Sequence, residues 1–311
     1  MKVSLVTTVK DEAATALELI RSILEQSRRP DEWLVVDGGS ADGTVEIFAA
    51  ETSCAVFSED GNIARGRNAG IDRAQGSVIA VIDGGCAAAP DWLERLVAPL
   101  ESGAADIAAG TTSPRIERPF DAAQWVLLDQ FGHPRLGILK SAVSSRSLAF
   151  SRRAWERCPY PEWLDHSEDT WLVEQWRRLD LRMIRVPDAV VQWCLRPTLA
   201  SWIRQHDRYM RGQGQAGLHG PRNLTRMLFY AVLLALVVGG VLSPGLLLAS
   251  AAAWGVYAAA TLVRFPGATA GRGFGFRSAT LAWLPVMLLT MDAAKITGYV
   301  RGRIDRLRSR R

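Results

Sequence analysis

The sequence predicts an α/β domain, with a mostly parallel central sheet and helices on both faces, followed by a C-terminal helical membrane region. Two patterns predict this arrangement. In the N-terminal half, short β-branched runs alternate with amphipathic helical segments, which is the spacing of βαβ units. Further on, residues 227–263 contain no charged residue, and this block is longer than a single membrane-spanning helix needs.

The strands of the N-terminal half are predicted from short apolar runs rich in valine and isoleucine. They are expected at residues 3–9, 33–36, 55–57 and 78–82. An amphipathic helix is expected at 13–24, and another behind the glycine-rich turn at 38–43. Asn62 is expected to cap a third helix, and Pro90 to open a fourth at its first turn, where the missing N–H costs little.

The pattern is weaker between residue 110 and the apolar block. Residues 113–146 show few clear elements, which suits a loop or a segment that covers a substrate. Extended segments are expected at 147–150, 183–186 and 190–194, a helix from Ser167 to about 178, and an amphipathic helix at 198–211.

Membrane helices are predicted at about 227–242 and 246–263, divided by Ser243-Pro244-Gly245. The dividing turn has no basic residue, whereas arginines precede and follow the apolar part of the chain, so the turn is expected outside and both flanks in the cytoplasm. A third apolar segment at about 278–298 is interrupted by Pro285, Asp292 and Lys295. We expect it to be a re-entrant or interfacial helix.

Charge and cysteine content limit the classes of partner and compartment. The net charge is +5 with a pI of about 9.3, and the arginines cluster beside the apolar block and in the tail at 301–311. Basic clusters in that position indicate lipid head groups rather than nucleic acid. The four cysteines lie far apart without a C-x-x-C pair, which favours reduced thiols over a zinc site. The N-terminal apolar run lacks a signal-peptide cleavage site, so the α/β domain is expected in the cytoplasm.

Two aspartates follow predicted strands and are candidates for ligand binding. Asp37 ends the run at 33–36, and Asp83 ends the run at 78–82. Ligands of open parallel sheets bind outside the carboxyl ends of the strands, where such acids can contact a nucleoside or a cation on phosphate. Each residue alone could equally be a turn aspartate. The chain contains no G-x-G-x-x-G or G-x-x-x-x-G-K-[ST] sequence, which weighs against dinucleotide dehydrogenases and P-loop enzymes.

Five segments, in order, resemble the motifs of family 2 glycosyltransferases of the membrane-anchored bacterial type. They are VVDGGSADGT at 35–44, ARGRNAG at 64–70, IDGG at 82–85, YPEWL with SED at 160–169, and QHDRY at 205–209. The resemblance covers residues 1 to about 215 and implies the GT-A nucleotide-sugar-binding fold. It implies a glycosyltransferase domain over 1–222, with a donor half at 1–112 and an acceptor half at 113–222. The membrane region would then cover 223–300.

The resemblance also implies roles for individual residues. On the donor side, Thr8 and Asp37 would line the nucleoside pocket, Arg67 would pair with the nucleotide, and Asp83 would bind ribose and a divalent metal. Without the resemblance, a solvated helix arginine is the better interpretation of Arg67.

On the acceptor side, Asp169 would be the general base and Glu168 would orient the acceptor. A helix N-terminus favours both carboxylates, although Ser-Glu-Asp is also an ordinary first turn. Gln205 and Arg208 would hold the diphosphate or the acceptor, while Tyr209 stands where the family usually has tryptophan. An amphipathic helix that presents Arg208 to lipid head groups is the alternative for this segment.

One position departs from the family pattern. The family has a D-x-D motif, but here Gly85 stands at the place of its second acid. Glycine has no side-chain ligand, so a divalent cation, Mg²⁺ or Mn²⁺, is expected to bind weakly or with the help of another group. His166 is a candidate for that group, but a partly exposed loop histidine is the simpler interpretation.

The resulting expectation is an inverting glycosyltransferase at the cytoplasmic membrane. Its partners would be a nucleotide-sugar donor, membrane lipids, and a polyprenyl phosphate, lipid-linked sugar or surface glycan as acceptor. Two alternatives stay open: a sugar-binding scaffold on the same fold, which Gly85 favours, and a nucleotidyltransferase, which also uses acids at strand ends.

Overall fold

The structure is a computed structural model that describes residues 1–128 and 143–309. The expectations for residues 129–142, in the middle of the weakly patterned segment, and for the last two arginines of the tail lie outside this range. The chain divides into two compact units. Unit 1 contains Met1–Arg115 and Ala142–Cys194, and unit 2 contains Ile116–Ser141 and Leu195–Arg311.

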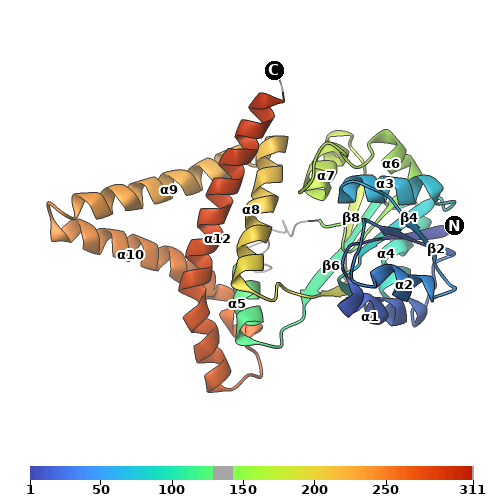
Figure 1. Cartoon of the computed structure of the whole chain (residues 1–311), viewed down its shortest axis with the longest axis horizontal. Helices are drawn as coiled ribbons and strands as arrows, with labels where there is room; N and C mark the ends of the chain where they lie inside the picture. Colours follow the sequence, from blue (N-terminus) through green and yellow to red (C-terminus); the bar gives the residue numbers. More distant parts are fainter. Residues whose placement is uncertain (129–142, 310–311) are drawn as a thin grey trace. The chain divides into compact units, whose positions relative to one another are not determined.

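Unit 1 is an eight-stranded sheet with helices on both faces (Figure 1). Its strands are β1 (Val3–Val9), β2 (Glu32–Asp37), β3 (Ala55–Ser58), β4 (Val78–Asp83), β5 (Cys86–Ala88), β6 (Ile107–Pro114), β7 (Leu148–Ser151) and β8 (Met183–Trp193). Its helices are α1 (Ala13–Leu24), α2 (Thr44–Ala49), α3 (Ile63–Arg73), α4 (Trp92–Glu101), α6 (Arg152–Arg157) and α7 (Glu168–Arg178).

The strand order is β3-β2-β1-β4-β7-β6-β8-β5. The first four strands are parallel, as are β6 and β8, while β7 and β5 run antiparallel to their neighbours. The parallel βαβ half therefore follows the prediction. The second half is more mixed than predicted, because β5 and β6 were not expected and β8 is one strand where two extended segments were predicted.

Side chains of the central strands alternate between two cores, as the pleat of a strand requires. Leu5 and Val35 face the core that α1 and α4 cover. Val6 and Val36 face the core that α3 and α7 cover. All seven residues of β1 are buried, which explains why its sequence is a continuous apolar and threonine run instead of an alternating one.

Helix α3 lies close to the sheet and begins where the sequence predicts. The Asn62 side chain accepts a hydrogen bond from the backbone N–H of Arg65 at 3.0 Å, which confirms it as the N-cap. At Gly70, a Cβ atom would lie 2.6 Å from Val6 Cγ1 and 3.0 Å from Val36 Cγ2. The absence of a side chain at this position therefore lets α3 contact β1 and β2.

The start of α7 differs from the prediction. Ser167 was expected to cap the helix, but it adopts a left-handed conformation with φ 63° and its side chain makes no capping hydrogen bond. The chain therefore turns sharply just before Glu168 and Asp169, the first two residues of α7.

Unit 2 is helical. It contains α5 (Pro119–Leu128), α8 (Leu199–Ala216), α9 (Gly220–Gly239), α10 (Pro244–Thr261), the 3-10 turn η2 (Leu262–Arg264), α11 (Phe265–Ala268) and α12 (Phe274–Arg308). Helices α8 and α12 pack side by side (Figure 1). Gly298 and Gly302 make this possible, because a Cβ at either position would collide with the backbone of Asp207 or Arg211 on α8.

The compact unit that holds the apolar helices also contains residues 195–222 and α5. The reason is their packing: Trp202 of α8 and Phe120 of α5 share a core with Met287 and Leu288 of α12. The predicted domain boundary at residue 222 stays a prediction.

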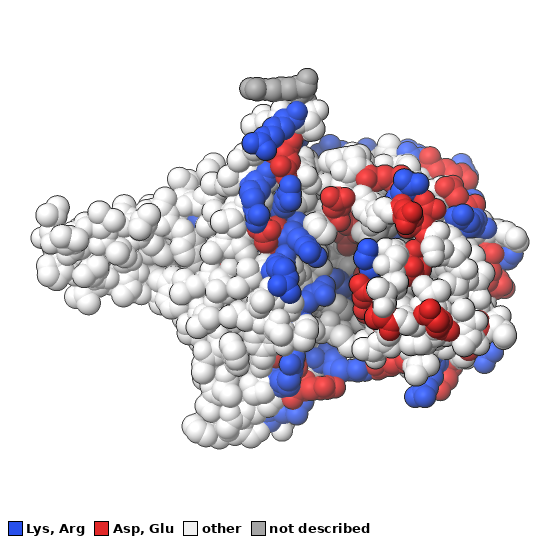
Figure 2. Space-filling model, viewed as in Figure 1, with Lys and Arg blue, Asp and Glu red and all other residues white. Residues whose placement is uncertain are grey.

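Helices α9 and α10 form the hairpin expected on either side of residues 243–245 (Figure 1). Their large apolar side chains, such as Leu234, Val238 and Leu248, are mostly exposed, and Figure 2 shows no charged residue over most of the visible hairpin. Helix α12 has 35 residues and contains the third apolar segment without a break at Pro285. Among the described residues, three helical segments are long and apolar enough to cross a membrane. They are α9, α12 and the continuous segment 244–268, which joins α10, η2 and α11. The length and composition of α12 therefore suit a membrane-spanning helix, whereas a re-entrant or interfacial helix was expected.

We predict that Gly70→Ala lowers the stability of unit 1. The added Cβ gains up to about 1 kcal/mol in helix propensity, but overpacking against Val6 typically costs about 1–3 kcal/mol. Gly66→Ala on the same helix is the control, because its Cβ would meet ordinary contacts at 3.5 Å and 3.7 Å. Thermal unfolding of the two variants should move in opposite directions. Equal melting temperatures would contradict the close packing of α3.

Candidate active site

The strand-end residues predicted from the sequence lie at one edge of the sheet. Thr8 of β1 pairs in register with Asp83 of β4 on one side and with Val36 of β2 on the other. Val9 pairs with Asp37. Thr8, Asp37 and Asp83 therefore stand at the carboxyl ends of three adjoining parallel strands, where ligands of this class of sheet bind.

Asp37 organises the turn that follows its own strand. Its carboxylate accepts hydrogen bonds from the backbone N–H of Gly39 at 2.9 Å, the backbone N–H of Ser40 at 3.2 Å and the hydroxyl of Ser40 at 2.5 Å. The side chain is only 2% exposed. Asp37 thus fixes the backbone of the turn at residues 38–40. Its contact with a nucleoside stays a prediction.

Arg67 joins two distant segments of unit 1. From the inner face of α3, its guanidinium donates to Glu168 Oε1 at 2.5 Å and to Asp83 Oδ1 at 2.7 Å. Its Cζ lies 5.2 Å from the centre of the Tyr160 ring. Arg67 is 2% exposed, so it is a buried ion-pair partner and not the solvated helix arginine that the residue pattern alone favoured.

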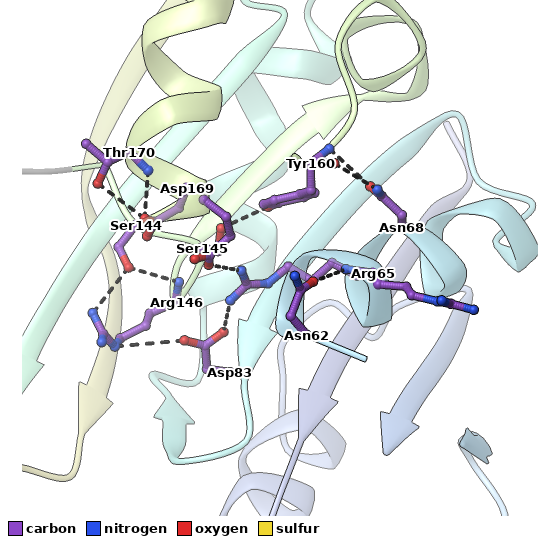
Figure 3. Close-up of polar contacts among 12 residues, drawn as sticks. Asn62, Arg65, Asn68, Asp83, Ser144, Ser145, Arg146, Tyr160, Asp169 and Thr170 are labelled. Atoms are coloured by element: carbon purple, nitrogen blue, oxygen red, sulfur yellow. Dashed lines mark hydrogen bonds and ion pairs between the residues drawn. The ribbon is translucent and has the colours of Figure 1, made fainter. Parts of the chain in front are cut away.

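A second arginine, which the sequence analysis missed, extends this chain of charges. Arg146 Nε lies 3.9 Å from Asp83 Oδ2, and Arg146 donates to the hydroxyl of Ser144 at 3.2 Å (Figure 3). Its guanidinium also stacks 4.1 Å from the centre of the Trp193 ring. Arg146 lies in the segment with few predicted elements, and no motif around it could have identified it. Asp83 therefore lies between two arginine side chains, which bring positive charge to the carboxyl end of β4.

The loop before α7 is fixed to α3 by amide side chains. Asn68 donates to the Tyr160 carbonyl at 2.9 Å and accepts from the Tyr160 N–H at 3.1 Å (Figure 3). Asn62 donates to the Glu162 carbonyl at 2.7 Å. The Tyr160 hydroxyl lies 2.8 Å from that of Ser145. These hydrogen bonds anchor the predicted acceptor motif at 160–164 to α3, just before α7 begins.

The two acids at the start of α7 occupy different environments. Glu168 is 7% exposed and paired with Arg67. Asp169 is partly exposed, and its Oδ1 accepts from the N–H and the hydroxyl of Thr170 at 2.7 Å and 3.3 Å (Figure 3). Burial and the neighbouring Asp169 carboxylate raise the pKa of Glu168 to about 7, against the opposing effect of Arg67. Asp169, with an accessible carboxylate at a helix N-terminus, is the better placed of the two to accept a proton from a substrate.

Glu12, which precedes α1, supplies a carboxylate beside the position where the D-x-D motif lacks one. A Cβ added at Gly85 would lie 3.3 Å from Glu12 Oε2 and 3.4 Å from Glu12 Oε1. A Cβ added at Gly84 would lie 3.0 Å from Glu12 Cγ. The two glycines therefore make room for Glu12. Sequence reasoning missed this residue because it lies more than seventy positions before the motif.

These residues fit a divalent cation only in part. Among residues 1–128 and 143–309, no group of three or more histidine, cysteine, aspartate or glutamate side chains is arranged to hold a metal. Asp83 and the Glu12 carboxylate beside Gly85 could serve a cation whose other ligands are diphosphate oxygens and water, as Mg²⁺ prefers.

Two polar atoms at this edge of the sheet are buried without a hydrogen-bond partner in the described part of the chain. They are Thr8 Oγ1 and Arg67 Nε. Buried polar atoms are nearly always paired in native proteins, and exceptions call for an explanation such as a ligand that completes them. Both residues are on the predicted donor side.

The remaining predicted residues lie on α8 in unit 2. Gln205 is buried and donates to the Tyr209 hydroxyl at 3.0 Å, so the two residues are one hydrogen-bonded pair along the helix. Arg208 is exposed on the same helix. Their predicted contacts with the diphosphate or the acceptor stay predictions.

Comparison with protein families identifies the N-terminal part of the chain. The family model described as "Glycosyl transferase family 2" matches residues 4–156. A curated relative, glycosyltransferase AglE of Haloferax volcanii, is 30% identical over 156 residues, which covers 47% of this chain and 49% of the relative. The chain thus spans about half the length of the curated relative it matches. The predicted family is confirmed.

Three solved structures have a similar fold, and two of them align with nearly the whole chain. Mannosyltransferase PcManGT of Pyrobaculum calidifontis, solved with GDP-Man and Mn²⁺, has a TM-score of 0.56 at 20% identity and covers 100% of this chain and 88% of its own. TarS of S. aureus, solved with UDP, has a TM-score of 0.50 at 14% identity and covers 99% and 92%. GalNAc-T7, solved with UDP, GalNAc and Mn²⁺, has a TM-score of 0.51 at 16% identity and covers 68% and 47%. These likenesses confirm the predicted GT-A fold.

We predict a pH-dependent stability difference between the native protein and Glu168→Gln. A carboxyl whose pKa is raised on folding stabilises the folded state below its unfolded pKa and loses that contribution as pH rises through the folded value. With a folded pKa of about 7, the native protein should lose stability relative to Glu168→Gln between about pH 4.5 and pH 7, by at most about 1.4 kcal/mol per pH unit. Above that window the difference should be constant. Melting temperatures of both proteins measured from pH 5 to pH 8 test this, and a native protein that gains stability relative to Glu168→Gln as the pH rises would contradict it.

Proposed function

We propose that this chain, whose residues 4–156 match glycosyl transferase family 2, transfers a sugar from a nucleotide-sugar donor, with inversion, to a membrane-associated acceptor. The observation that carries the proposal is the Arg67 bridge. It ties Asp83, at the end of β4, to Glu168, at the start of α7. A donor that contacts Asp83 therefore lies on the same side of the sheet as the α7 acids.

The proposed reaction has one displacement step. The acceptor oxygen attacks the anomeric carbon of the sugar on the face opposite to the nucleoside diphosphate, and the bond from that carbon to the diphosphate oxygen breaks. Asp169 accepts the proton that the acceptor oxygen loses. Glu168 takes no proton from the acceptor in this scheme, because Arg67 holds it in a buried ion pair; it positions Asp169 at the start of the helix.

Asp83 and Glu12 are the proposed protein groups for a divalent cation. When bound, the cation would offset the negative charge that develops on the departing diphosphate. Arg146 contributes positive charge at the same carboxylate. This arrangement of charges supports departure of the nucleoside diphosphate even with a D-x-D motif that has lost its second acid.

The acceptor is proposed to be a polyprenyl phosphate or a lipid-linked sugar. Three apolar helices could hold such a lipid, and they are few for a channel that moves a growing glycan, which is the second acceptor class considered. The arginines at the start of α9 and in the C-terminal tail favour the cytoplasmic face for the catalytic unit under the positive-inside rule.

We predict that Asp169→Asn abolishes sugar transfer but not donor binding. Loss of a general base typically costs about 10²–10⁴-fold in rate, while nucleoside diphosphate should still raise the melting temperature. Asp188→Asn is the matched control, because Asp188 is 78% exposed on the same unit. Nucleoside diphosphate release from UDP-, GDP- and dTDP-sugars, with and without polyprenyl phosphate, measures the rate. Full activity of Asp169→Asn would rule out its role as base.

We predict that Glu12→Gln weakens Mn²⁺ binding in the presence of GDP or UDP by about tenfold, equivalent to about 1.4 kcal/mol. Glu25→Gln, at the exposed end of α1, is the control. In the Glu12→Gln background, Gly85→Asp should restore binding, because its side chain would enter the space beside residue 12. Electron paramagnetic resonance of free Mn²⁺ measures the affinity independently of turnover. Unchanged affinity in Glu12→Gln would exclude Glu12 from the cation site.

A further inference from the structure

Unit 2 contains a cavity of about 560 Å³ at one end of the α9–α10 hairpin. Its lining comes from the first turns of α9, the last turn of α10, η2 and one residue of α5. The volume lies within the usual range for a small-molecule site, about 300–1,000 Å³. None of the catalytic or donor-side residues proposed above lines it.

Three arginines line the cavity. Arg222 and Arg226 reach it from α9, and Arg264 reaches it from η2. No aspartate or glutamate occurs among the described residues that line it. Arginine is the side chain best suited to phosphate, because its planar guanidinium can donate two parallel hydrogen bonds.

Arg226 is held in place from behind the cavity. Its Nε lies 3.2 Å from Asp292 Oδ1 on α12, and Asp292 is fully buried. The other oxygen of Asp292 accepts hydrogen bonds from Tyr230 at 2.9 Å and Tyr257 at 2.7 Å. Charged residues inside helices of this apolar character are costly and mark functional sites. One buried carboxylate thus fixes one of the three arginines that line the cavity.

Much of the remaining lining of the cavity is apolar, beside two threonines and a tyrosine. Val126, Phe229, Ala260 and Val263 line it, and the Phe229 ring packs 5.1 Å from that of Tyr257. A cavity lined by both arginines and hydrocarbon fits an amphiphile better than a free phosphate ion. The position of the cavity also suits a lipid. Its arginines lie at the end of the hairpin that the positive-inside rule places beside the lipid head groups.

We propose that this cavity binds the head group of a single-chain lipid that carries a phosphate, with the arginines on the phosphate and the apolar wall on the first part of the chain. The inference rests on the proposed function, for which such a lipid would be the acceptor. The arginines supply the charge complementarity, and the hairpin supplies the path of the chain into the membrane.

Photocrosslinking in nanodiscs of phosphatidylcholine tests the proposal with the full-length protein. The probe is an isoprenyl monophosphate with a diazirine beside the head group, and the sites of labelling are mapped by peptide sequencing. Labelling is expected on the lining of the cavity. Unlabelled isoprenyl monophosphate should compete, whereas the isoprenyl alcohol and phosphatidylglycerol should compete at least about tenfold less well.

Single arginine variants give the second readout. Arg222→Gln and Arg264→Gln should each weaken competition by isoprenyl monophosphate about tenfold, the effect of losing about 1.4 kcal/mol of binding. Arg303→Gln, on the exposed side of α12 and outside the cavity lining, should bind like the native protein. Arg226 is left intact, because its loss would leave Asp292 buried without its ion pair. Melting temperatures confirm that the variants fold.

The proposal is overturned by labelling outside the cavity, by equal competition from the alcohol or phosphatidylglycerol, or by native affinity in both arginine variants. Release of nucleoside diphosphate separates this result from the proposed function. Release with a different acceptor and no labelling of the cavity overturns only the lipid site. Labelling of the cavity without release on any acceptor supports the lipid site and contradicts the proposed transfer.

Discussion

The candidate active site depends on one buried guanidinium. Arg67 is almost fully enclosed and carries its charge between two carboxylates from distant parts of the chain. Burying a charge costs several kcal/mol unless it is paired with good geometry, so the folded state favours an arrangement in which Asp83 and Glu168 both face Arg67. The same requirement fixes the end of β4 against the start of α7. Placement of the proposed base is thus a consequence of satisfying a buried charge.

Helix α3 anchors most of the segments that form the candidate active site. Asn62 and Asn68 hold the loop before α7, and Gly70 allows the helix to sit directly on β1 and β2. A rigid helix packed on parallel strands is a better support for a site than a surface loop, because its side chains have few alternative positions. The loop at 160–164 can therefore contact a substrate while its backbone stays anchored.

In unit 2, apolar and charged side chains are separated along the α9–α10 hairpin. Its hairpin exposes large aliphatic side chains and has almost no charge along its length, whereas arginines gather at one end beside a cavity. The exposed aliphatic side chains suit the hydrocarbon core of a membrane. The clustered arginines suit the phosphate-rich layer of lipid head groups. Asp292 is the exception within the apolar helices, and its buried pairing with Arg226 is what makes that exception tolerable.

The sequence by itself determined the elements whose signal is local. Apolar β-branched runs predicted the parallel strands, Asn62 was correctly predicted as a helix cap, and an uncharged block predicted the hairpin. Acids at strand ends were also readable, because the carboxyl ends of parallel strands share an edge. The order of motifs was enough to predict the family and the fold.

Only the tertiary structure decided which side chains meet. Arg67 and Glu168 are 101 residues apart, and the local pattern of α3 gave no reason to bury an arginine. Arg146 beside Asp83 and Glu12 beside Gly85 have no sequence signature, since each contact depends on how a loop or helix start folds over the sheet edge. The same holds for α8 and α12, whose glycines are contact points between the two helices.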